Sequence, residues 1–313
     1  MNFRTEIKTK PQQNTIDYNS KVLLIGSCFT QNIGDKLDYY KFNNLINPLG
    51  IIFHPRAIEN IIISSIENKV FTIDDLVFQN ERWHCFDVHS DFSHQDKNLM
   101  LARINSTIKQ TKQYLETTSH IVITLGTAWV YRYNKTNNLV ANCHKIPQKE
   151  FNKELLPITD IANGLSTIID KVHQINPNAQ ILFTVSPVRH LKDGFIENQL
   201  SKAHLILAIH QVLNHKIHYF PAYEIMMDDL RDYRFYKKDM IHPNEIAIDY
   251  IWNKFMETWI NPSEKKTIEE VKQINNGLAH KPFNENSKQH RLFLEKLHQK
   301  INDLKKTKGI SFS

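Results

Sequence analysis

The sequence predicts an α/β fold, a three-layer α/β/α sandwich around a parallel sheet, followed by a C-terminal helical extension. Short apolar runs alternate with stretches of helical periodicity, which is typical of parallel strands joined by βαβ crossovers. A chain of 313 residues with 41% hydrophobic content is large enough to bury a sizeable core. Beyond residue 260 the pattern changes to charged helical segments, which indicates an extension to that sandwich.

Four apolar runs are expected to form buried strands, and helical segments separate them. The expected strands are Val22–Ile25, Ile121–Leu125, Ile181–Val185 and Ile217–Phe220. The expected helices are Arg56–Asn68, Asp96–Thr117, Asp160–Asn176, one after Gly194 with Leu200, His204, Leu207 and Val212 at helical spacing, and one from Pro243. A β-hairpin is expected from Leu76–Phe78 and Trp83–Val88, joined through Gln79–Arg82.

A boundary is expected near Asn261–Pro262, dividing the chain into residues 1–260 and a basic extension of residues 261–313. The extension holds 11 Lys and Arg against 6 Asp and Glu, so it carries +5 of the chain's net +6. Two helices are expected in it, Ser263–Asn276 and Asn284–Lys306. The second has a seam-like stripe of Leu294, Leu297, Ile301 and Leu304. We expect this stripe to pack on its own domain, with a homodimer through the helix as the alternative.

The first apolar run ends in two candidate nucleophiles. Gly26 closes the run, and Ser27 and Cys28 follow it before a helical pattern begins. A side chain at such a strand-to-helix turn lies at the carboxyl edge of the sheet, where open α/β proteins bind ligands. A Gly-Ser-Cys turn is more often only a turn, so a catalytic interpretation requires a partner.

The segment Asp239-Met-Ile-His-Pro243 supplies the partner. Pro243 suits the first position of a helix, which predicts that His242 is the cap residue, where the helix dipole disfavours imidazolium. Asp239 can bind the second ring nitrogen of His242 and set its tautomer. Together these residues match the nucleophile, base and orienter of acyl-transfer triads.

These motifs resemble the GSCFA domain family, a branch of the SGNH (GDSL-type) hydrolase superfamily. The name-giving segment is Gly26-Ser-Cys-Phe-Thr30 here, with threonine at the position of the alanine. Further blocks that look like the family are Asn47–Gly50, Leu125–Trp129, Asn142–Lys145, Ser186–His190 and Asp229–Phe235. The resemblance runs over roughly residues 20–260 and implies the flavodoxin-like sandwich of SGNH hydrolases. It also implies hydrolysis of small acyl esters, carbohydrate-linked ones included, through an acyl-enzyme. The alternatives are an acyltransferase with a thioester donor and a carbohydrate acceptor, or a catalytically silent ligand-binding domain.

Alignment with the Gly-Asp-Ser-Leu block of the superfamily favours Cys28 as the nucleophile. Ser27 would then cap the following helix, although it stays the alternative nucleophile. A thiol at a helix N-terminus beside a histidine is expected to have a lowered pKa. The competing interpretation is that Cys28 is only a small buried hydrophobe.

The resemblance implies that backbone N–H groups of Cys28 and Gly50 bind the oxyanion, with an ordinary tight turn as the alternative role of Gly50. The third block offers Gly126 and Thr127, but Ala128 stands where the superfamily has an asparagine side-chain donor. Asn142, in the block that also contains His144, is the candidate replacement. Two further residues, Arg189 and His190, follow a predicted strand and are expected to hold an anionic or hydroxyl-rich substrate, unless Arg189 only pairs with Asp193.

The sequence also restricts the kinds of ligand and partner that we expect. His84, Cys85, Asp87, His89, His94, Cys143 and His144 lack the paired spacing of a metal site, so we expect no metal and no cofactor. The chain shows no nucleic-acid module, no secretory signal and no apolar run long enough to span a bilayer. Three cysteines without an export signal fit a reducing compartment. We therefore expect a cytoplasmic protein that binds a small-molecule or carbohydrate ester, and neither nucleic acid nor membrane.

Overall fold

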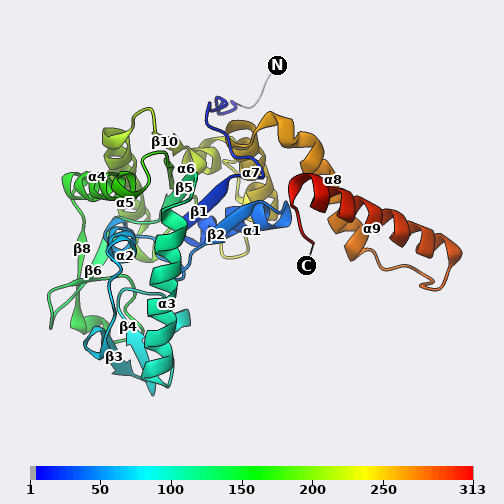
Figure 1. Ribbon diagram of the computed structural model, residues 1–313. Coiled ribbons are helices and arrows are strands. Elements are labelled where there is room, and N and C mark those ends of the chain that lie inside the picture. The colour runs from blue at the N-terminus through cyan, green and yellow to red at the C-terminus, as the bar shows by residue number, and fades with distance from the viewer. Residues whose placement is uncertain (1–4, 313) are drawn as a thin grey trace.

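The computed structural model describes residues 5–312, and its centre is a five-stranded parallel sheet (Figure 1). Its order is β10-β9-β5-β1-β2, and every neighbouring pair runs parallel. Numbered along the chain, the strands lie in the order 2-1-3-4-5 of flavodoxin-like doubly wound sheets, so the predicted fold class is confirmed. The strands are β1 (Lys21–Gly26), β2 (Asn43–Ile46), β5 (His120–Leu125), β9 (Gln180–Val185) and β10 (Ile217–Phe220).

The central strands are continuous apolar runs because helices cover both faces of the sheet. Along each strand, side chains alternate between two buried clusters: Leu23 and Ile123 belong to one, and Val22 and Val122 to the other. Helices of the first cluster are α2 (Pro55–Ile66), α3 (Lys97–Leu115), α4 (Ile158–Ile175) and α5 (Phe195–Val212). Those of the second are α1 (Cys28–Tyr39) and α7 (Glu245–Trp259), with the short α6 (Ala222–Glu224) after β10.

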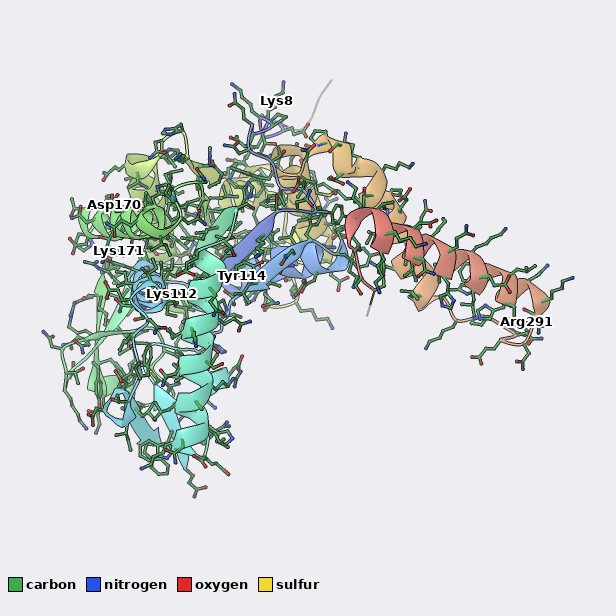
Figure 2. The ribbon with its side chains drawn as sticks, in the orientation of Figure 1. Lys8, Lys112, Tyr114, Asp170, Lys171 and Arg291 are labelled. Atoms are coloured by element: carbon green, nitrogen blue, oxygen red, sulfur yellow. The ribbon has the colours of Figure 1, made fainter. Side chains whose placement is uncertain are left out.

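The edge strand β2 is absent from the sequence-based prediction. Only Leu45 and Ile46 of its four residues are apolar, and its side chains are at least partly exposed, so it lacks the apolar run of a central strand. Tyr114 of α3 (Figure 2) donates a hydrogen bond to Asn43 Oδ1 at 3.1 Å, which ties this helix to the edge strand.

The buried face of α5 differs from the predicted stripe. Leu200 and Leu207 are 45% and 53% exposed, whereas Ser201 and Lys202 are buried with Leu205. The polar pair is buried because it hydrogen-bonds to the chain at the ends of strands, a demand that apolar periodicity does not reveal.

Two small antiparallel sheets flank the sandwich. The hairpin of β3 (Leu76–Gln79) and β4 (Arg82–Cys85) confirms the predicted one, although its second strand ends at Cys85 instead of Val88. Its turn consists of Asn80 and Glu81, whose φ angles of 49° and 59° match the type I′ turns that two-residue hairpins favour. A three-stranded sheet, with order β7-β6-β8, is absent from the prediction. Its strands are β6 (Trp129–Tyr133), β7 (Leu139–Val140) and β8 (Phe151–Leu155).

The C-terminal helices α8 (Lys265–Ala279) and α9 (Lys288–Lys308) pair as a helical arm that projects from the sandwich, with Arg291 at its far end (Figures 1 and 2). Both predicted helices are present, with ends shifted by two to four residues. Leu297 and Leu304 of the predicted stripe pack against Val271 and Ile274 of α8. No helix within residues 5–312 has the length and apolar character that crossing a bilayer requires. The division at residue 261 stays a prediction.

Candidate active site

The turn after β1 places Ser27 and Cys28 at the carboxyl edge of the sheet. Gly26 adopts a φ of 150°, and a Cβ there would lie 2.3 Å from the carbonyl oxygen of Thr124 on β5. Ser27 N–H donates to that same carbonyl at 3.2 Å. The turn is therefore fastened to the neighbouring strand at a position where only glycine fits.

Ser27 and Cys28 have different surroundings. Ser27 is 2% exposed, and its Oγ accepts a hydrogen bond from the Phe29 N–H at 3.2 Å as the N-cap of α1. The predicted capping role of Ser27 is confirmed. Cys28 is the first residue of the helix and is only partly buried, so the thiol is the more accessible of the two groups.

The expectation of a lowered thiol pKa is wrong. Burial raises the pKa of Cys28 above its ordinary value, because a thiolate loses solvation in this environment. The backbone N–H groups of Cys28 and Phe29 and the charges of Lys202 and Lys237 oppose this rise, but they do not reverse it. The thiol is therefore protonated at neutral pH.

Asp239 and His242 form a hydrogen-bonded pair. The distance from His242 Nδ1 to Asp239 Oδ2 is 2.7 Å, and Asp239 Oδ1 accepts the backbone N–H groups of His242 and Ile241 at 3.0 and 2.9 Å. The hydrogen bonds from the backbone of His242 and Ile241, and then from the His242 ring, lower the pKa of Asp239 to about 2. A carboxylate at Nδ1 favours the tautomer in which Nε2 accepts a proton, as a general base requires.

His242 is not the helix cap that the sequence predicts. The helix α7 begins at Glu245, and its cap is Asn244, whose Oδ1 accepts the Ala247 N–H at 3.1 Å. Asparagine is among the preferred N-cap residues, whereas Pro243 pairs with Tyr236 in an isolated bridge before the helix. His242 thus lies in the preceding loop, and the helix-dipole argument does not apply to it.

Arg189 fastens this loop to the end of β9. Its backbone N–H donates to Ile241 O at 3.3 Å, and its guanidinium donates to Met240 O and lies 4.2 Å from the ring centre of Tyr236. Asp193 instead pairs with Lys153 at 2.5 Å. The structure therefore gives Arg189 a bracing role, where the sequence suggests substrate binding or a pair with Asp193.

His190 follows Arg189 in the segment after β9. Its ring stacks on Phe53, with 5.4 Å between ring centres, and its Nε2 is buried with no hydrogen-bond partner among residues 5–312. Burial, followed by the charges of Lys202 and His242, lowers the pKa of His190 to about 3. The ring of His190 is therefore neutral at neutral pH.

The candidate oxyanion donors are mostly engaged in local structure. Gly50 N–H donates to Asn47 O at 2.8 Å, in agreement with the tight-turn alternative, and Asn47 Oδ1 accepts the Gly26 N–H at 2.9 Å. Gly126 N–H donates to Phe53 O at 2.7 Å. Thr127 Oγ1 lies 2.9 Å from Ser201 Oγ. These groups shape the edge of the sheet around the Cys28 turn.

Asn142 and His144 belong to a buttressed loop. Asn142 Oδ1 accepts the His144 N–H at 2.9 Å, and His144 Nε2 lies 2.7 Å from Cys85 O. Burial lowers the pKa of His144 to about 4, so its ring is a neutral anchor that holds the loop to β4. His84 stacks on His144 with 4.8 Å between ring centres. Among the described residues, no three His, Cys, Asp or Glu side chains gather closely enough to hold a metal ion.

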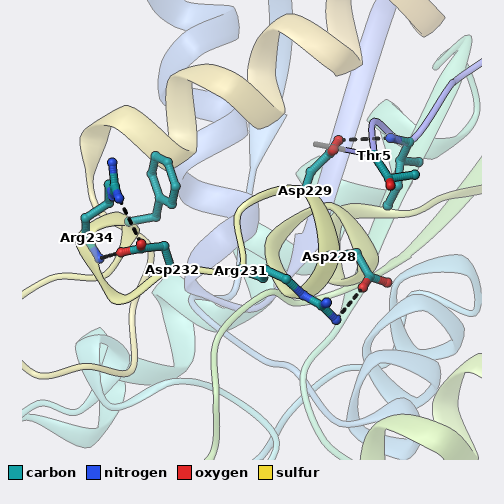
Figure 3. A pocket seen from close by; sticks show the side chains of 8 residues that line it. Thr5, Asp228, Asp229, Arg231, Asp232 and Arg234 are labelled. Atoms are coloured by element: carbon teal, nitrogen blue, oxygen red, sulfur yellow. Dashed lines mark hydrogen bonds and ion pairs between the residues drawn. The ribbon is translucent and has the colours of Figure 1, made fainter. Parts of the chain in front are cut away.

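A cleft of about 280 Å³ brings Thr127, Asn142 and His190 together. Its other lining includes the aromatic residues Phe53, Trp129 and Tyr131. A larger cleft, of about 620 Å³, lies near Asp229 (Figure 3). Its charges are matched locally by the pairs Arg231–Asp228 and Arg234–Asp232, and its described lining contains none of the predicted site residues.

Lys202 is the site-edge residue that the sequence analysis misses. Its side chain is 1% exposed, and its Nζ donates to Gly126 O at 2.7 Å and Ser186 O at 2.8 Å, just beyond the ends of β5 and β9. Burial lowers the pKa of Lys202 to about 7. A lysine within a helical pattern is usually exposed, so the sequence gives little sign that Lys202 is buried. The one available signal is its place beside Ser201, on the helix face opposite Leu200.

Two models of known protein families match the chain. The sequence matches the model of the GSCFA family over residues 21–255, and that of the GSCFA domain protein, C-terminal domain, over residues 271–313. None of the curated proteins matches the chain.

Two solved structures are distantly similar. One is an acetyl xylan esterase (Est2A) from the rumen bacterium Butyrivibrio proteoclasticus, with 11% identity over 85% of this chain and 66% of that chain, at a TM-score of 0.36. The other is a carbohydrate esterase family 3 protein from Talaromyces cellulolyticus, with 11% identity over 81% of this chain and 99% of that chain, at a TM-score of 0.32. The first family match runs from the start of β1 into α7 and thus spans most of the sequence, so the chain belongs to the GSCFA family.

Proposed function

We propose that this protein is an SGNH-like hydrolase that cleaves ester bonds of small acyl esters. Cys28 is the nucleophile, His242 the general base and Asp239 the residue that orients His242. The observation that carries the proposal is the Asp239–His242 hydrogen bond of 2.7 Å, on a loop that Arg189 fastens to the sheet edge. That edge also carries the Cys28 turn.

The buried position of Ser27 favours Cys28 as the nucleophile. Attack by Ser27 would require its Oγ to leave the cap of α1, which costs the helix about 1 kcal/mol. Attack by Cys28 requires no loss of a helix cap, because Cys28 is partly exposed and does not cap the helix. Because its pKa is raised, a resting thiolate is scarce, and a base must remove the proton as the sulfur attacks.

The reaction then takes two steps. His242 Nε2 accepts the thiol proton while Sγ bonds to the ester carbonyl carbon, and the backbone N–H of Cys28, at the start of α1, stabilises the oxyanion. The tetrahedral intermediate collapses, the C–O bond breaks, and the proton on His242 passes to the departing alcohol. Water then attacks the thioester and gives its proton to His242, and the acid is released as the thiol is restored.

The aromatic cleft supports a carbohydrate-linked ester. Trp129 and Tyr131 combine a broad apolar face with a polar group, and Asn142, Lys192 and Asp193 add hydrogen-bonding groups to the same cleft. Such a lining suits a sugar, whose ring has apolar faces and hydroxyl edges. In this proposal the cleft holds the sugar while the acyl group reaches Cys28.

A thiol nucleophile favours acyl transfer as the second candidate function. A cysteine acyl-enzyme is itself a thioester, so it can form from a thioester donor at little energetic cost and pass its acyl group to a sugar hydroxyl. The ligand-binding alternative rests on Ala128, which offers no side-chain donor and whose N–H is bound to Ser201 Oγ at 2.7 Å.

Turnover of p-nitrophenyl acetate tests the proposal. Cys28→Ala and His242→Ala are expected to reduce turnover to the buffer rate, whereas Ser27→Ala retains it. Cys85→Ala is the matched control, because it removes another free thiol, one that lies in β4 and outside the lining of the aromatic cleft. Loss of turnover in Ser27→Ala with retention in Cys28→Ala would make serine the nucleophile.

A second set of reactions separates the alternatives. Acyl-coenzyme A with a sugar acceptor would yield acyl-sugar only if the protein is a transferase. A wild-type protein at the buffer rate with both the ester and the thioester would refute the hydrolase and the transferase, and leave the ligand-binding domain.

A further inference from the structure

Lys202 is a buried lysine that forms no ion pair within residues 5–312. Its ammonium instead contacts two backbone carbonyls, those of Gly126 and Ser186. Both belong to the segments that leave the central strands β5 and β9. Burying a lysine amine without a carboxylate is costly, which marks this position as more than an ordinary helix surface.

The Cys28 turn lies beside the same strand end. Ser27 N–H donates to the carbonyl of Thr124, two residues before Gly126, and β1 pairs with β5 through Gly26 and Thr124. The ionisation of Cys28 and that of Lys202 are coupled: the charge on Lys202 lowers the pKa of the thiol, and a thiolate raises the pKa of the lysine. The two groups therefore stabilise each other when both are charged.

We propose that Lys202 is an electrostatic positioning residue of this site, which holds the ends of β5 and β9 beside the Cys28 turn and stabilises negative charge on the Cys28 sulfur. The catalytic use of that charge rests on the function proposed above. The charge stabilisation itself is a property of the resting protein and does not require an ester substrate.

Other charged groups also influence the ionisation of Cys28 and its surroundings. Lys237 also lowers the pKa of Cys28, whereas Lys202 and His242 both lower the pKa of His190. The ring of Tyr223 lies 5.4 Å from Lys202 Nζ and packs over it as an uncharged neighbour. Lys202 is distinct among these groups because it is buried, so its charge is poorly screened by solvent and counter-ions.

The charge of Lys202 can also compensate for the side-chain oxyanion donor that Ala128 lacks. Positive potential fixed beside the reacting atoms stabilises developing negative charge without reorganisation of solvent. Lys202 contacts the carbonyl of Gly126, two residues before Ala128, and thus places that potential close to the third motif block.

The pH dependence of Cys28 alkylation tests the proposal. Iodoacetamide would be applied to wild type and Lys202→Met, and modification would be read by mass spectrometry on the tryptic peptide 22–36, which contains only Cys28. Below pH 7, where Lys202 still carries its charge, loss of that charge is expected to raise the pKa of Cys28 by about one unit and so to slow alkylation about tenfold at pH 6.5. The difference should shrink above pH 7, as Lys202 loses its proton. Lys254→Met is the matched control, since it removes another buried lysine, which lies on α7 and pairs with Glu6 and Glu257.

An unchanged alkylation profile in folded Lys202→Met would overturn the proposal and leave Lys202 a merely structural residue. Lys202→Gln, which keeps a hydrogen-bond donor without the charge, is expected to behave like Lys202→Met. If neither variant folds, Cys28→Asp decides: its carboxylate stands in for the thiolate, and the titration of Lys202, followed by NMR on 13Cε-labelled lysine, is expected to move to higher pH. An unmoved titration would refute the coupling. Failure of ester turnover alone would refute the proposed function and leave this result intact.

Discussion

Gly26→Ala is expected to be one of the most damaging small substitutions in this protein. The added Cβ would lie 2.3 Å from Thr124 O and 2.8 Å from Thr124 N, both backbone atoms of a central strand that cannot move independently. Overpacking of this kind costs about 1–3 kcal/mol. The φ of 150° adds about 1–3 kcal/mol of backbone strain for a residue that carries a Cβ. The free energy of unfolding should therefore fall by about 2–6 kcal/mol, a large fraction of the total stability of a typical domain.

Urea denaturation measures this loss, with Gly309→Ala as the matched control. Gly309 also has a positive φ, 69°, but a Cβ there meets no described atom within 4 Å, so only the conformational cost of about 1 kcal/mol applies. Because the same turn positions Cys28, surviving Gly26→Ala protein should also lose about 100-fold in ester turnover, as a misplacement of 1 Å does elsewhere. Equal unfolding free energies in the two variants would refute the close contact of β1 with β5.

Three further changes test other parts of the structure. Ser27→Ala should lower the free energy of unfolding by about 1 kcal/mol in urea denaturation, because the Phe29 N–H loses its partner, and unchanged stability would contradict the capping role. Burial lowers the pKa of His54 from 6.5 to about 4, so the unfolded chain binds the proton first, and stability is complete above pH 6.5 and lost as the pH falls toward 4. The contribution is about 3 kcal/mol for 2.5 pKa units, and urea denaturation at pH 7 and pH 4.5 should show a smaller difference in His54→Gln than in wild type. Leu297→Ala should destabilise the α8–α9 arm by about 2–4 kcal/mol, seen as faster hydrogen exchange in both helices, while ester turnover stays at the wild-type rate.

The parallel sheet could be predicted because its central strands are buried on both faces. Such strands must be continuous apolar runs, as Ile121–Leu125 and Ile181–Val185 are. The edge strand β2 and the sheet around β6 escape this signal, since each leaves side chains partly exposed and mixes polar with apolar residues. The buried face of α5 escapes prediction for a different reason, because Ser201 and Lys202 are polar residues whose burial depends on hydrogen bonds at the strand ends.

The candidate site likewise contains residues that the sequence predicts and residues that it does not. The Gly26-Ser27-Cys28 turn and the Asp239–His242 pair depend on residues close in sequence, so their local chemistry is visible in the order of residues. Arg189 donates to Met240 O, 51 residues away, and this contact is not visible in the order of residues. Gly50 donates to Asn47 O in the tight turn that the sequence offered as its alternative role.

The sequence by itself therefore determined the fold class, which follows from apolar periodicity, and the two candidate catalytic motifs, which follow from short-range spacing; the family follows from the resemblance of its motif blocks. Only the tertiary structure decided that Ser27 is buried while Cys28 is accessible, that the thiol pKa is raised, and that Lys202 lies beneath the sheet edge. Each of these depends on solvation, which is set by what surrounds a group in space. Residues far apart in the chain create that environment, so it exists only once the sheet and its helices have packed.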